Sequence, residues 1–572
     1  MTVVTDASFL PCADALSNEV RHWHAHKWGR MVRNVRRLQV RIVKAMQCGN
    51  RRRAQALQRL LAGSYSAKVL AVRRVTENEG SRTAGVDGQR WSTPAEKMAG
   101  VKGLEERPYR AKPLLRKYIP KKNGKLRPLG IPTMQDRAKQ AVYLFALDPV
   151  AETTADANSY AFRRERSCAD AIEQCFRVLY RKEAAEWILE GDIKACFDQI
   201  AHPWLMEHIP INRTVLRQWL KAGYLEKRTL YPTETGTPQG GIISPVLANM
   251  TLDGLEALLK QKYPRHKGLK VHLVRYADDF IITCSSREVL EKEIRPLVEE
   301  FLRKRGLELS AEKTLITHID DGFDFLGQTI RKFKGKLIIK PSDKSQKILL
   351  TKVREIVRGE GEHLSAFGLL RRLNPLLRGW TNYHRHVASA KTFKRIEQQV
   401  YQTLWRWAMR RHPGKPQDWV YRKYFFDKQK RKRPFHAYTT DEEGNTLVCE
   451  IFQPNRVPIR RHIKVIGEAN PYDPKWELYF EQRRYRRVAD ELPRRPKLVT
   501  LFRLQKGLCP ICNQPITKET GWNCHHILWR VYGGGDEIDN LLLLHPTCHQ
   551  QLHNPNSGAL LLRPRRAGVR DA

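Results

Sequence analysis

Two long stretches of the chain place apolar residues three or four positions apart, which is the spacing of one helix face. In residues 19–75 the pattern is interrupted at Gly49-Asn50, which predicts a break between helices. Residues 344–411 predict two further apolar stripes. The positions of the first stretch are Leu38, Ile42, Ala45, Met46, Leu57, Leu60 and Leu61, and those of the second are Leu369, Leu370, Leu373, Leu376, Leu377, Trp380, Val400, Leu404 and Trp407.

Two shorter stretches predict strands that end in acids. Residues 186–192 form an apolar run that ends at Asp192, and residues 271–284 place apolar side chains on both sides of Tyr276-Ala277-Asp278-Asp279. Because β-branched residues favour strands and Asp tolerates turn dihedrals, the second stretch predicts a hairpin with two carboxylates at its tip.

The charge of the chain indicates a polyanionic partner. Lys and Arg number 103 and Asp and Glu 60, which gives a net charge of +43 over 572 residues. Such an excess opposes folding through self-repulsion unless a polyanion relieves it, so nucleic acid is the expected partner. Arg residues crowd the polar faces of the first helices, which favours an RNA-facing extension at least as much as a solvated surface. A membrane partner is disfavoured, since no apolar run is long enough to span a bilayer.

The acid hairpin has an ordinary interpretation and a catalytic one. Adjacent Asp residues are usually a solvated turn, and Asp320-Asp321 is interpreted in that way. Asp278-Asp279 differs because apolar runs flank it and because the strand that ends at Asp192 could supply a third carboxylate. Neighbouring carboxylates repel each other unless a cation lies beside them, and oxygen ligands suit Mg²⁺. Three carboxylates around two divalent ions are what two-metal phosphoryl transfer requires.

A basic hairpin is predicted between residues 118 and 132, where Asn123-Gly124 makes a tight turn between two strand-like arms. It would bring together Lys121, Lys122, Lys125 and Arg127. The hairpin is either an ordinary basic surface or a clamp for the phosphates of an incoming triphosphate.

The cysteines predict one metal site near the C-terminal end. Of the 11 cysteines, seven are scattered before residue 500 and four fall between Cys509 and Cys548. This distribution suits a reducing cytoplasm rather than a disulfide framework. Cys509-Pro-Ile-Cys512 and His545-Pro-Thr-Cys548 have the same spacing, which is typical of a structural tetrahedral Zn²⁺ site. Cys524 is a rival for the fourth ligand, and the spacing leaves that choice open.

In their order along the chain, these blocks resemble the group II intron-encoded reverse transcriptases and maturases. Besides the basic hairpin and Asp192 with Phe197, the resemblance rests on Thr83-Ala-Gly-Val-Asp-Gly88, Gly236-Thr-Pro-Gln-Gly240, Tyr276-Ala-Asp-Asp279, Leu309-Ser-Ala-Glu-Lys-Thr314 and Phe323-Asp-Phe-Leu-Gly327. It implies that Asp192, Asp278 and Asp279 hold two Mg²⁺ ions. It also implies that Phe197 excludes a ribose 2′-hydroxyl, that Gln239 lines the nucleotide pocket beside Lys125 and Arg127, and that Lys313 lies near the triphosphate.

The resemblance continues downstream. Arg378-Gly-Trp-Thr-Asn-Tyr-His384 resembles the family's maturase region, a helical thumb that grips intron RNA, so Arg378, Trp380 and Tyr383 are predicted RNA contacts. Residues 428–434 predict an exposed linker. Residues 435–492, with a hairpin about residues 441–445 and a basic tail at residues 483–487, stand where the family has a DNA-binding segment.

The C-terminal section resembles the HNH nucleases of the ββα-metal type, which end many group II intron proteins. The resemblance implies that His525, His549 and His553 bind a catalytic divalent ion and that His526 is the general base that activates water. Asn540 would fix the loop that holds this base. His545 stands where many relatives have Cys.

The sequence therefore predicts a multidomain α+β protein with a right-hand polymerase. The expected parts are an N-terminal helical RNA-binding extension (1–75), reverse transcriptase fingers and palm (76–340), an α-helical thumb or maturase domain (341–430), a DNA-binding segment (431–497), an HNH endonuclease domain (498–560) and a basic tail (561–572).

The expected function is an RNA-directed DNA polymerase that binds its intron RNA, assists splicing and nicks target DNA for intron mobility. Deoxynucleoside triphosphates are the expected substrates, and the expected location is the cytoplasm of a bacterium or an organelle, as a ribonucleoprotein. A homodimer is left open.

Two other classes of function are disfavoured by the sequence. Many RNA-dependent RNA polymerases carry a second Asp where this chain has Phe197, which disfavours that class. A splicing factor without catalytic duty need not keep Asp192, Asp278 and Asp279 together, which disfavours a purely RNA-binding role.

Overall fold

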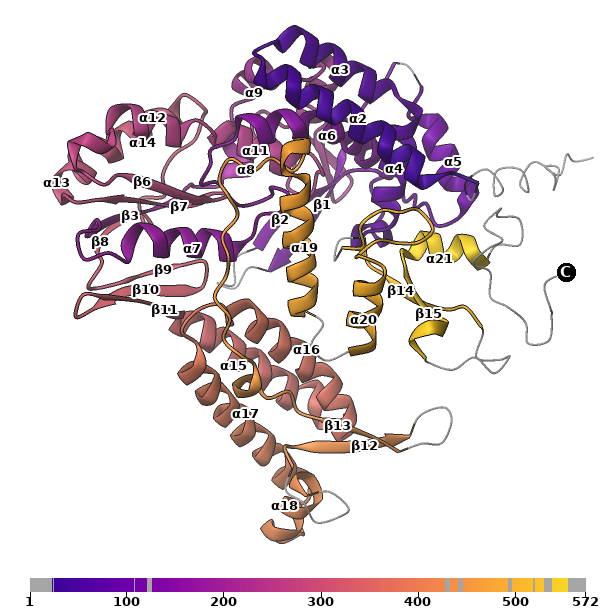
Figure 1. Ribbon diagram of the computed structural model, residues 1–572, viewed down its shortest axis with the longest axis vertical. Helices are drawn as coiled ribbons and strands as arrows, with labels where there is room; N and C mark the ends of the chain where they lie inside the picture. Colours follow the sequence, from indigo (N-terminus) through magenta and orange to yellow (C-terminus); the bar gives the residue numbers. More distant parts are fainter. Residues whose placement is uncertain are drawn as a thin grey trace, which may run out of the picture.

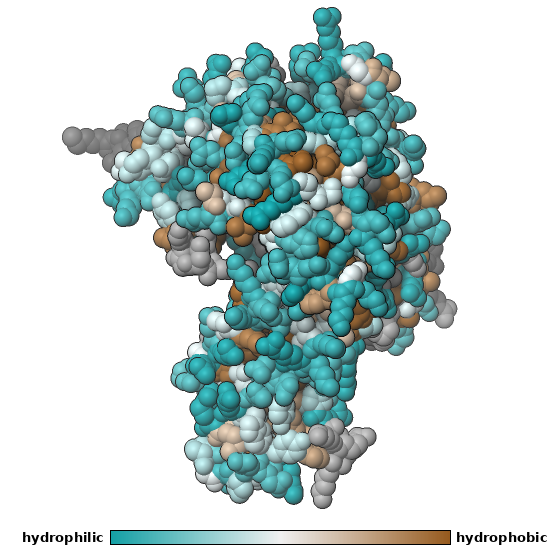
Figure 2. Space-filling model, turned by 90° about the vertical axis from the view of Figure 1, so that its left-hand side faces the viewer, coloured by the Kyte–Doolittle hydropathy of each residue, from teal (hydrophilic) through white to brown (hydrophobic). Residues whose placement is uncertain are grey.

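The computed structural model describes residues 23, 25–106, 108–120, 126–426, 433–440, 446–491, 496–517, 520–528 and 537–553. Figure 1 shows an upper body that contains the N-terminal helices and the main sheets, with a helical lobe below it. The side view in Figure 2 shows a narrower region between these parts and apolar residues recessed in a mostly hydrophilic surface. No helix within the described ranges is long and apolar enough to cross a membrane.

The N-terminal helices confirm the predicted break at Gly49-Asn50. Helix α2 (Trp28–Gln47) ends there, and Asn50 caps α3 (Arg51–Gly63) by accepting a hydrogen bond from the Arg53 backbone N–H. Helices α4 (Tyr65–Thr76) and α5 (Pro94–Gly103) follow, and α6 (Met134–Thr154) packs against this group. Leu57 and Leu61 are buried as predicted, whereas Leu60 is 57% exposed because α3 turns only its Leu57–Leu61 edge to the core.

A four-stranded sheet in the order β2-β1-β4-β5 lies beside these helices. Its strands are β1 (Leu114–Pro120), β2 (Leu126–Ile131), β4 (Tyr224–Glu226) and β5 (Thr229–Tyr231). Strands β1 and β2 pair antiparallel with Pro120 opposite Leu126, which confirms the two arms predicted for the basic hairpin. The turn between them, residues 121–125, lies outside the described residues, and with it lies the predicted nucleotide contact Lys125.

The central sheet has the strand order β6-β7-β3-β8 and carries helices on both faces. Its strands are β3 (Trp187–Asp192), β6 (His272–Tyr276), β7 (Asp279–Cys284) and β8 (Leu315–His318). One face, with Leu189 and Ile282, packs against α11 (Ser244–Leu252), α12 (Leu255–Lys262) and α14 (Arg295–Arg303). The other face, with Ile188 and Ile281, packs against α7 (Cys168–Leu179). Alternate residues of β3, β6 and β7 therefore enter two different cores. Figure 1 shows α7 on one side of this sheet and α12 and α14 on the other.

Short elements connect these parts. They are α8 (Cys196–Gln199), α9 (His202–His208), α10 (Arg213–Leu220), α13 (Arg287–Val289), and the three strands of a small sheet, β9 (Phe323–Phe325), β10 (Gln328–Phe333) and β11 (Lys336–Pro341). Asp320 and Asp321 are exposed in the turn before β9, as expected of an ordinary loop.

The helical lobe confirms the apolar stripes predicted in residues 344–411. It consists of α15 (Asp343–Arg358), α16 (Ala366–His384), α17 (Ala390–Arg411), α18 (Gln417–Phe425) and the hairpin β12 (His436–Thr440) and β13 (Thr446–Glu450). The leucines of α16 at residues 369, 370, 373 and 377 are fully buried and meet Val400, Leu404 and Trp407 of α17.

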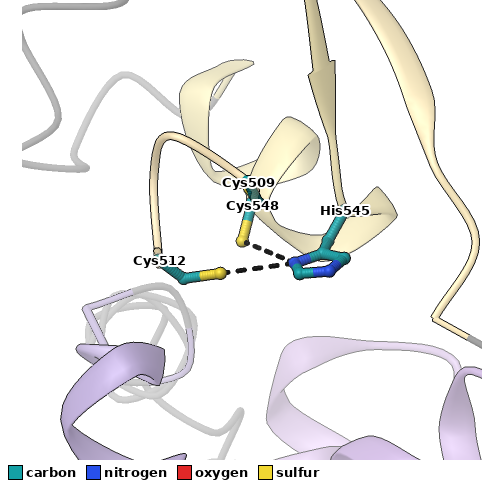
Figure 3. A group of neighbouring side chains, drawn as sticks. All are labelled: Cys509, Cys512, His545 and Cys548. Atoms are coloured by element: carbon teal, nitrogen blue, oxygen red, sulfur yellow. Dashed lines mark hydrogen bonds between the residues drawn. The ribbon is translucent and has the colours of Figure 1, made fainter. Parts of the chain in front are cut away.

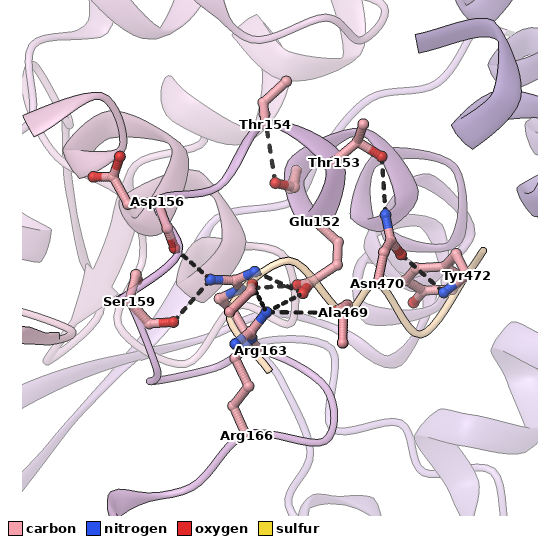
Figure 4. Close-up of polar contacts among 12 residues, drawn as sticks. Glu152, Thr153, Thr154, Asp156, Ser159, Arg163, Arg166, Ala469, Asn470 and Tyr472 are labelled. Carbon is pink, nitrogen blue, oxygen red and sulfur yellow. Dashed lines mark hydrogen bonds and ion pairs between the residues drawn. The ribbon is translucent and has the colours of Figure 1, made fainter. Parts of the chain in front are cut away.

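A returning segment, residues 451–476, runs from the helical lobe back to the upper body. Arg166 donates hydrogen bonds to the Gly467 and Ala469 carbonyls at 2.9 and 3.3 Å, and Asn470 donates to Thr153 Oγ1 at 3.1 Å (Figure 4). Much of the predicted DNA-binding segment is thus packed against the fold. Arg483 of α19 (Glu477–Glu491), expected in a basic tail, is buried and donates to Asp170 Oδ1.

The C-terminal unit begins with α20 (Pro496–Leu504) and contains β14 (Asn523–His526), β15 (Leu541–Leu544) and α21 (Pro546–His553). The two strands pair antiparallel, with His526 opposite Leu541. This is the ββα arrangement expected from the sequence.

Candidate functional site

The predicted acid hairpin forms at one end of the central sheet, where β3 ends and β7 begins. Tyr276 pairs with Asp279 across a two-residue loop, and Asp192 of β3 lies directly opposite Asp279 of β7. The first loop residue, Ala277, has φ of +58°, as a tight hairpin turn of this length requires. The pairing of β3 with β7 therefore brings Asp192 to the acids Asp278 and Asp279, which lie 86 and 87 residues later in the chain.

Close packing fixes the register of these strands. A Cβ atom on Gly191 would lie 2.2 Å from the Phe280 ring, so only glycine leaves room for this ring beside the strand. Phe280 itself is buried, which anchors the strand that carries Asp279.

The charges around the hairpin favour cation binding. Burial raises the pKa of Asp278, and the like charge of Asp192 raises it further, while Arg127 and Lys313 act in the opposite sense. Desolvation followed by repulsion from Asp278 and Asp192 raises the pKa of Asp279 to about 6. Lys313 Nζ donates to Asp192 Oδ2 at 2.8 Å. Arg127 and Lys313 are thus close enough to the acids for their positive charges to act on the carboxylates.

A residue that sequence reasoning missed supports the hairpin turn. Arg275 is fully buried in β6, pairs with Asp253, and donates hydrogen bonds to Asn249 Oδ1 at 3.2 Å and to the Ala277 carbonyl at 3.5 Å. Its guanidinium therefore links α11 to the turn that carries Asp278. The available signal was a lone Arg within an apolar strand, since an unpaired buried charge is too costly to occur without a partner.

The predicted gate residue Phe197 and the predicted pocket residue Gln239 belong to neighbouring segments that share contacts. Phe197 sits on α8, where its ring meets Phe162 edge-on at a centroid distance of 6.2 Å. Its backbone carbonyl accepts a hydrogen bond from Thr237 N at 2.6 Å, so the Gly236–Gly240 loop lies against α8. Gln239 in this loop donates to Asp198 Oδ2 at 2.8 Å, and its carbonyl accepts from Gly130 N of β2.

Two of the predicted RNA contacts of the helical lobe make internal hydrogen bonds. The Trp380 indole donates to Ser345 Oγ at 3.0 Å, and the Tyr383 hydroxyl donates to the Leu326 carbonyl at 2.9 Å. Tyr383 remains 39% exposed, and Arg378 is exposed with its guanidinium 5.4 Å from the centre of the Phe452 ring.

The C-terminal Cys and His pairs converge on one point. Cys509, Cys512, His545 and Cys548 are buried, and their ligand atoms all lie within 4.8 Å of one another (Figure 3). His545 Nε2 contacts the Pro515 carbonyl at 3.1 Å, a hydrogen bond that requires a proton on Nε2 and leaves Nδ1 facing the three sulfurs. Cys524 is exposed on β14 and lies outside the cluster, so the geometry selects His545 as the fourth member. Three thiolates and one imidazole fit a tetrahedral metal site.

The other predicted nuclease residues gather on β14 and α21. The rings of His525 and His549 lie 5.3 Å apart, and His525 is buried. Asn540 holds the chain just after His526, because its side chain exchanges hydrogen bonds of 2.6 and 3.0 Å with the Leu528 backbone. The side chain of His553, the third predicted ligand, lies outside the described residues.

The C-terminal unit docks on the N-terminal helices. Cys509, Cys512 and Cys548 belong to the same apolar core as Trp23 and Trp28. A Cβ atom on Gly29 of α2 would lie 2.6 Å from the Cys512 carbonyl, so the backbones meet closely here. Figure 3 shows the helices of the N-terminal region beside the cluster.

Models of known protein families match four stretches of the chain. Family models match residues 23–104 as the N-terminal domain of reverse transcriptase, 119–330 as reverse transcriptase (RNA-dependent DNA polymerase), 346–425 as the group II intron maturase-specific domain, and 509–555 as HNH endonuclease. The fold and sites thus define a reverse transcriptase with a maturase domain and an HNH endonuclease domain.

Two similar proteins indicate which family of reverse transcriptases the chain belongs to. Protein YkfC of Escherichia coli (strain K12) is 33% identical over 306 residues, which cover 46% of this chain and 80% of that protein. The group II intron-encoded protein LtrA of Lactococcus lactis subsp. cremoris is 32% identical over 328 residues, which cover 46% of this chain and 54% of LtrA, about half its length. The chain belongs to the group II intron-encoded reverse transcriptase and maturase family.

Among solved structures, telomerase from Candida albicans in complex with a fragment of telomeric RNA is similar at a TM-score of 0.31 and 13% identity. The match covers 55% of this chain and 64% of that one.

Proposed function

We propose that the chain is an RNA-directed DNA polymerase that binds its group II intron RNA, assists its splicing, and nicks target DNA for intron mobility. The observation that carries the proposal is the meeting of Asp192, Asp278 and Asp279 at one end of the central sheet, with Arg127 and Lys313 beside them. The central sheet would be the palm, the sheet with β1 and β2 the fingers, and the helical lobe the thumb.

The substrates would be deoxynucleoside triphosphates, added to a primer along an RNA template. Asp192, Asp278 and Asp279 would hold two Mg²⁺ ions, which stabilise the entering and leaving oxygens of phosphoryl transfer when bound. Arg127 and Lys313 would offset the negative charge of the triphosphate, and Lys125 is proposed for the same role. Gln239, held by Asp198, would line the pocket.

Phe197 would select the sugar. An aromatic ring beneath the deoxyribose leaves no volume for a 2′-hydroxyl, so it discriminates by steric exclusion. Its contacts with Phe162 and with the loop at Thr237 keep the ring and its backbone in place.

The C-terminal unit would cut the second strand of the target DNA. His526 would act as the general base on water, with Asn540 holding its loop. His525, His549 and His553 would bind the catalytic divalent ion, and Cys509, Cys512, His545 and Cys548 would bind a structural Zn²⁺. Arg378, Trp380 and Tyr383 are proposed contacts of the intron RNA, and the whole would act as a ribonucleoprotein.

Primer extension on an RNA template tests the polymerase assignment. We expect the wild type to extend the primer with deoxynucleotides and to reject ribonucleotides. Phe197→Val should raise ribonucleotide incorporation, because it opens the space beneath the sugar. Phe333→Val, which removes a partly exposed ring on β10, is the control and should keep wild-type selectivity. Extension with ribonucleotides by the wild type, or unchanged selectivity in Phe197→Val, would contradict the assignment.

A further inference from the structure

Helix α7 presents an exposed ridge at the end of the central sheet opposite the acids. The ridge includes Arg177 and the residues just after the helix, Tyr180 and Arg181, all of which are exposed. Strand β6 begins beside this ridge at His272 and ends at Tyr276, next to the acid hairpin. At about 3.3 Å per residue, the strand separates the ridge from the acids by roughly 15 Å. The ridge is therefore separate from the polymerase site.

A cavity of about 820 Å³ opens on one side of the ridge, between α7 and α12. Its buried lining includes the apolar side chains of Leu259, Leu273 and Ala185 together with one carboxylate, that of Glu256. Its edge is cationic, because Arg177, Arg181, Lys260, Arg265 and Lys270 line it with exposed side chains. The volume lies in the range of ordinary ligand pockets, and an apolar interior with a cationic edge suits a flat base attached to phosphate.

A second hollow of about 540 Å³ lies on the other side of the ridge, against the returning segment. Here the rings of Phe176 and Tyr180 stack at a centroid distance of 5.4 Å and an interplanar angle of 8°. The Arg461 guanidinium covers Phe176 at 4.2 Å from the ring centre. Tyr180 is 44% exposed, and the Arg181 guanidinium lies 5.7 Å from its ring centre and donates to its hydroxyl, so a base that extends the stack would meet both the ring and this cation.

The charge balance around both hollows favours an anion. Six cationic side chains line them, against the three carboxylates of Glu173, Glu183 and Glu256. Glu256 pairs with Lys260, and Glu173 pairs with Arg177 and Arg461, so six positive charges against three negative ones leave an excess of three. The pKa of Lys464, close behind the ridge, is lowered to about 8 by burial and by the positive charge of Arg177 and Arg166.

We propose that the α7 ridge is a second nucleic-acid-binding site, which takes a single-stranded segment of RNA. The cations bind its phosphates, one base enters the apolar cavity, and another stacks on Tyr180. A duplex is disfavoured, because its paired bases cannot enter the cavity or extend the stack. The choice of RNA rests on the proposed function, whereas the chemistry of the site would also accept single-stranded DNA.

Photocrosslinking tests the site on the full-length protein. Single strands of RNA or DNA of about 12 nucleotides that carry 5-iodouridine are irradiated with the protein, and crosslinked peptides are identified by mass spectrometry. We expect a crosslink to RNA at Phe176 or Tyr180. Tyr180→Ala, and separately Arg177→Glu with Arg181→Glu, should each reduce the crosslink to the α7 region about fivefold or more. Lys182→Glu makes the same kind of charge reversal on an exposed neighbour that lines neither hollow, and it should leave the yield unchanged.

Three outcomes would overturn the proposal: no RNA crosslink at α7, an undiminished yield in the double charge reversal, or an equal crosslink to double-stranded RNA. A stronger crosslink to DNA than to RNA would keep the site but overturn the choice of RNA. Primer extension by the same variants should match the wild type. A wild type that crosslinks at α7 but does not extend primers would refute the proposed function and leave this site in place.

Discussion

The acid hairpin of the central sheet and the C-terminal Cys and His cluster are held in place by different means. Asp192 and Asp279 are positioned by the ladder between β3 and β7, with helices packed on both sheet faces. Within the described residues, the C-terminal unit has two four-residue strands and helices of nine and eight residues, and its buried side chains share a core with the N-terminal helices. It also contains the one cluster of Cys and His side chains among the described residues that could hold a metal ion, next to the N-terminal helices.

This difference predicts how each site responds to the loss of one ligand residue. The positions of Asp192 and Asp279 are set by the pairing of β3 with β7. In the proposed function, the metal ions would take part in the reaction but would not be needed to form this arrangement. In the proposed function, the nuclease geometry would depend on a metal bound within a core that is shared with Trp23 and Trp28, nearly 500 positions earlier in the chain. Loss of a ligand should therefore disable the polymerase without unfolding it, but should unfold the C-terminal unit.

The largest expected effect is that of Cys509→Ala. A structural Zn²⁺ contributes folding free energy directly, with binding free energies of about 10–16 kcal/mol in zinc-finger peptides. We expect the variant to lose zinc and DNA cleavage. It should become sensitive to protease after residue 496 and also near Trp23 and Trp28, which share the core. Zinc analysis and limited proteolysis with mass mapping measure this.

His526→Ala is the matched variant, because its side chain lies outside the Cys and His cluster. Loss of a general base should lower DNA cleavage about 10²–10⁴-fold while zinc content and protease resistance stay unchanged. If His526→Ala loses zinc, or Cys509→Ala keeps it, the division into catalytic and structural residues is wrong.

A smaller effect is expected from Arg275→Lys. The lysine keeps a charge for Asp253 but cannot also reach Asn249 and the Ala277 carbonyl, so the turn that carries Asp278 should loosen. We expect primer extension to fall about 10–100-fold, with a higher Mg²⁺ requirement. Arg305→Lys, which alters a partly buried Arg bonded to the Thr251 and Phe301 carbonyls, is the control and should keep its Mg²⁺ dependence. Equal Mg²⁺ dependence in both variants would show that Arg275 does not position the acids.

The smallest effect concerns the stability of the ion-free fold. The pKa of Asp279 is about 6 when folded, above the value of about 3.9 expected when unfolded, so ionisation of Asp279 opposes folding. The cost is absent below about pH 4, grows between about pH 4 and 6, and is complete above that. Asp279→Asn should therefore raise Tm at pH 7.5 by about 1–2 °C in chelator, since water screens this exposed carboxylate. The gain should vanish near pH 4. Thermal unfolding of both proteins at the two pH values tests this, and a lower Tm for the variant at pH 7.5 would count against it.

Local patterns predicted the parts of the fold that local forces decide. Apolar runs around Tyr276–Asp279 predicted the hairpin, and helical spacing predicted the stripes of α16 and α17. The equal spacing of Cys509-Cys512 and His545-Cys548 predicted their meeting, because each pair alone is half of a tetrahedral site.

The rest depends on contacts between distant residues. The role of Arg275 follows from Asn249 and Asp253, which only the packed α11 brings near. The docking of the C-terminal unit joins Gly29 to Cys512, and no local pattern relates these positions. Similarly, the basic run at residues 483–487 predicted a basic tail in a DNA-binding segment, whereas Arg483 is buried and pairs with the buried Asp170.

The most direct test of the central claim measures two properties of one variant, Asp278→Asn. Primer extension on an RNA template and equilibrium binding of intron RNA are compared with the wild type at one salt concentration. The account predicts that extension falls more than about 100-fold, since even groups that only orient a metal ligand cost 10–100-fold. Intron RNA binding should stay within about twofold, because it depends on the distributed basic surface. Normal extension by Asp278→Asn, or loss of RNA binding in the folded variant, would contradict the assignment of this hairpin as the polymerase centre.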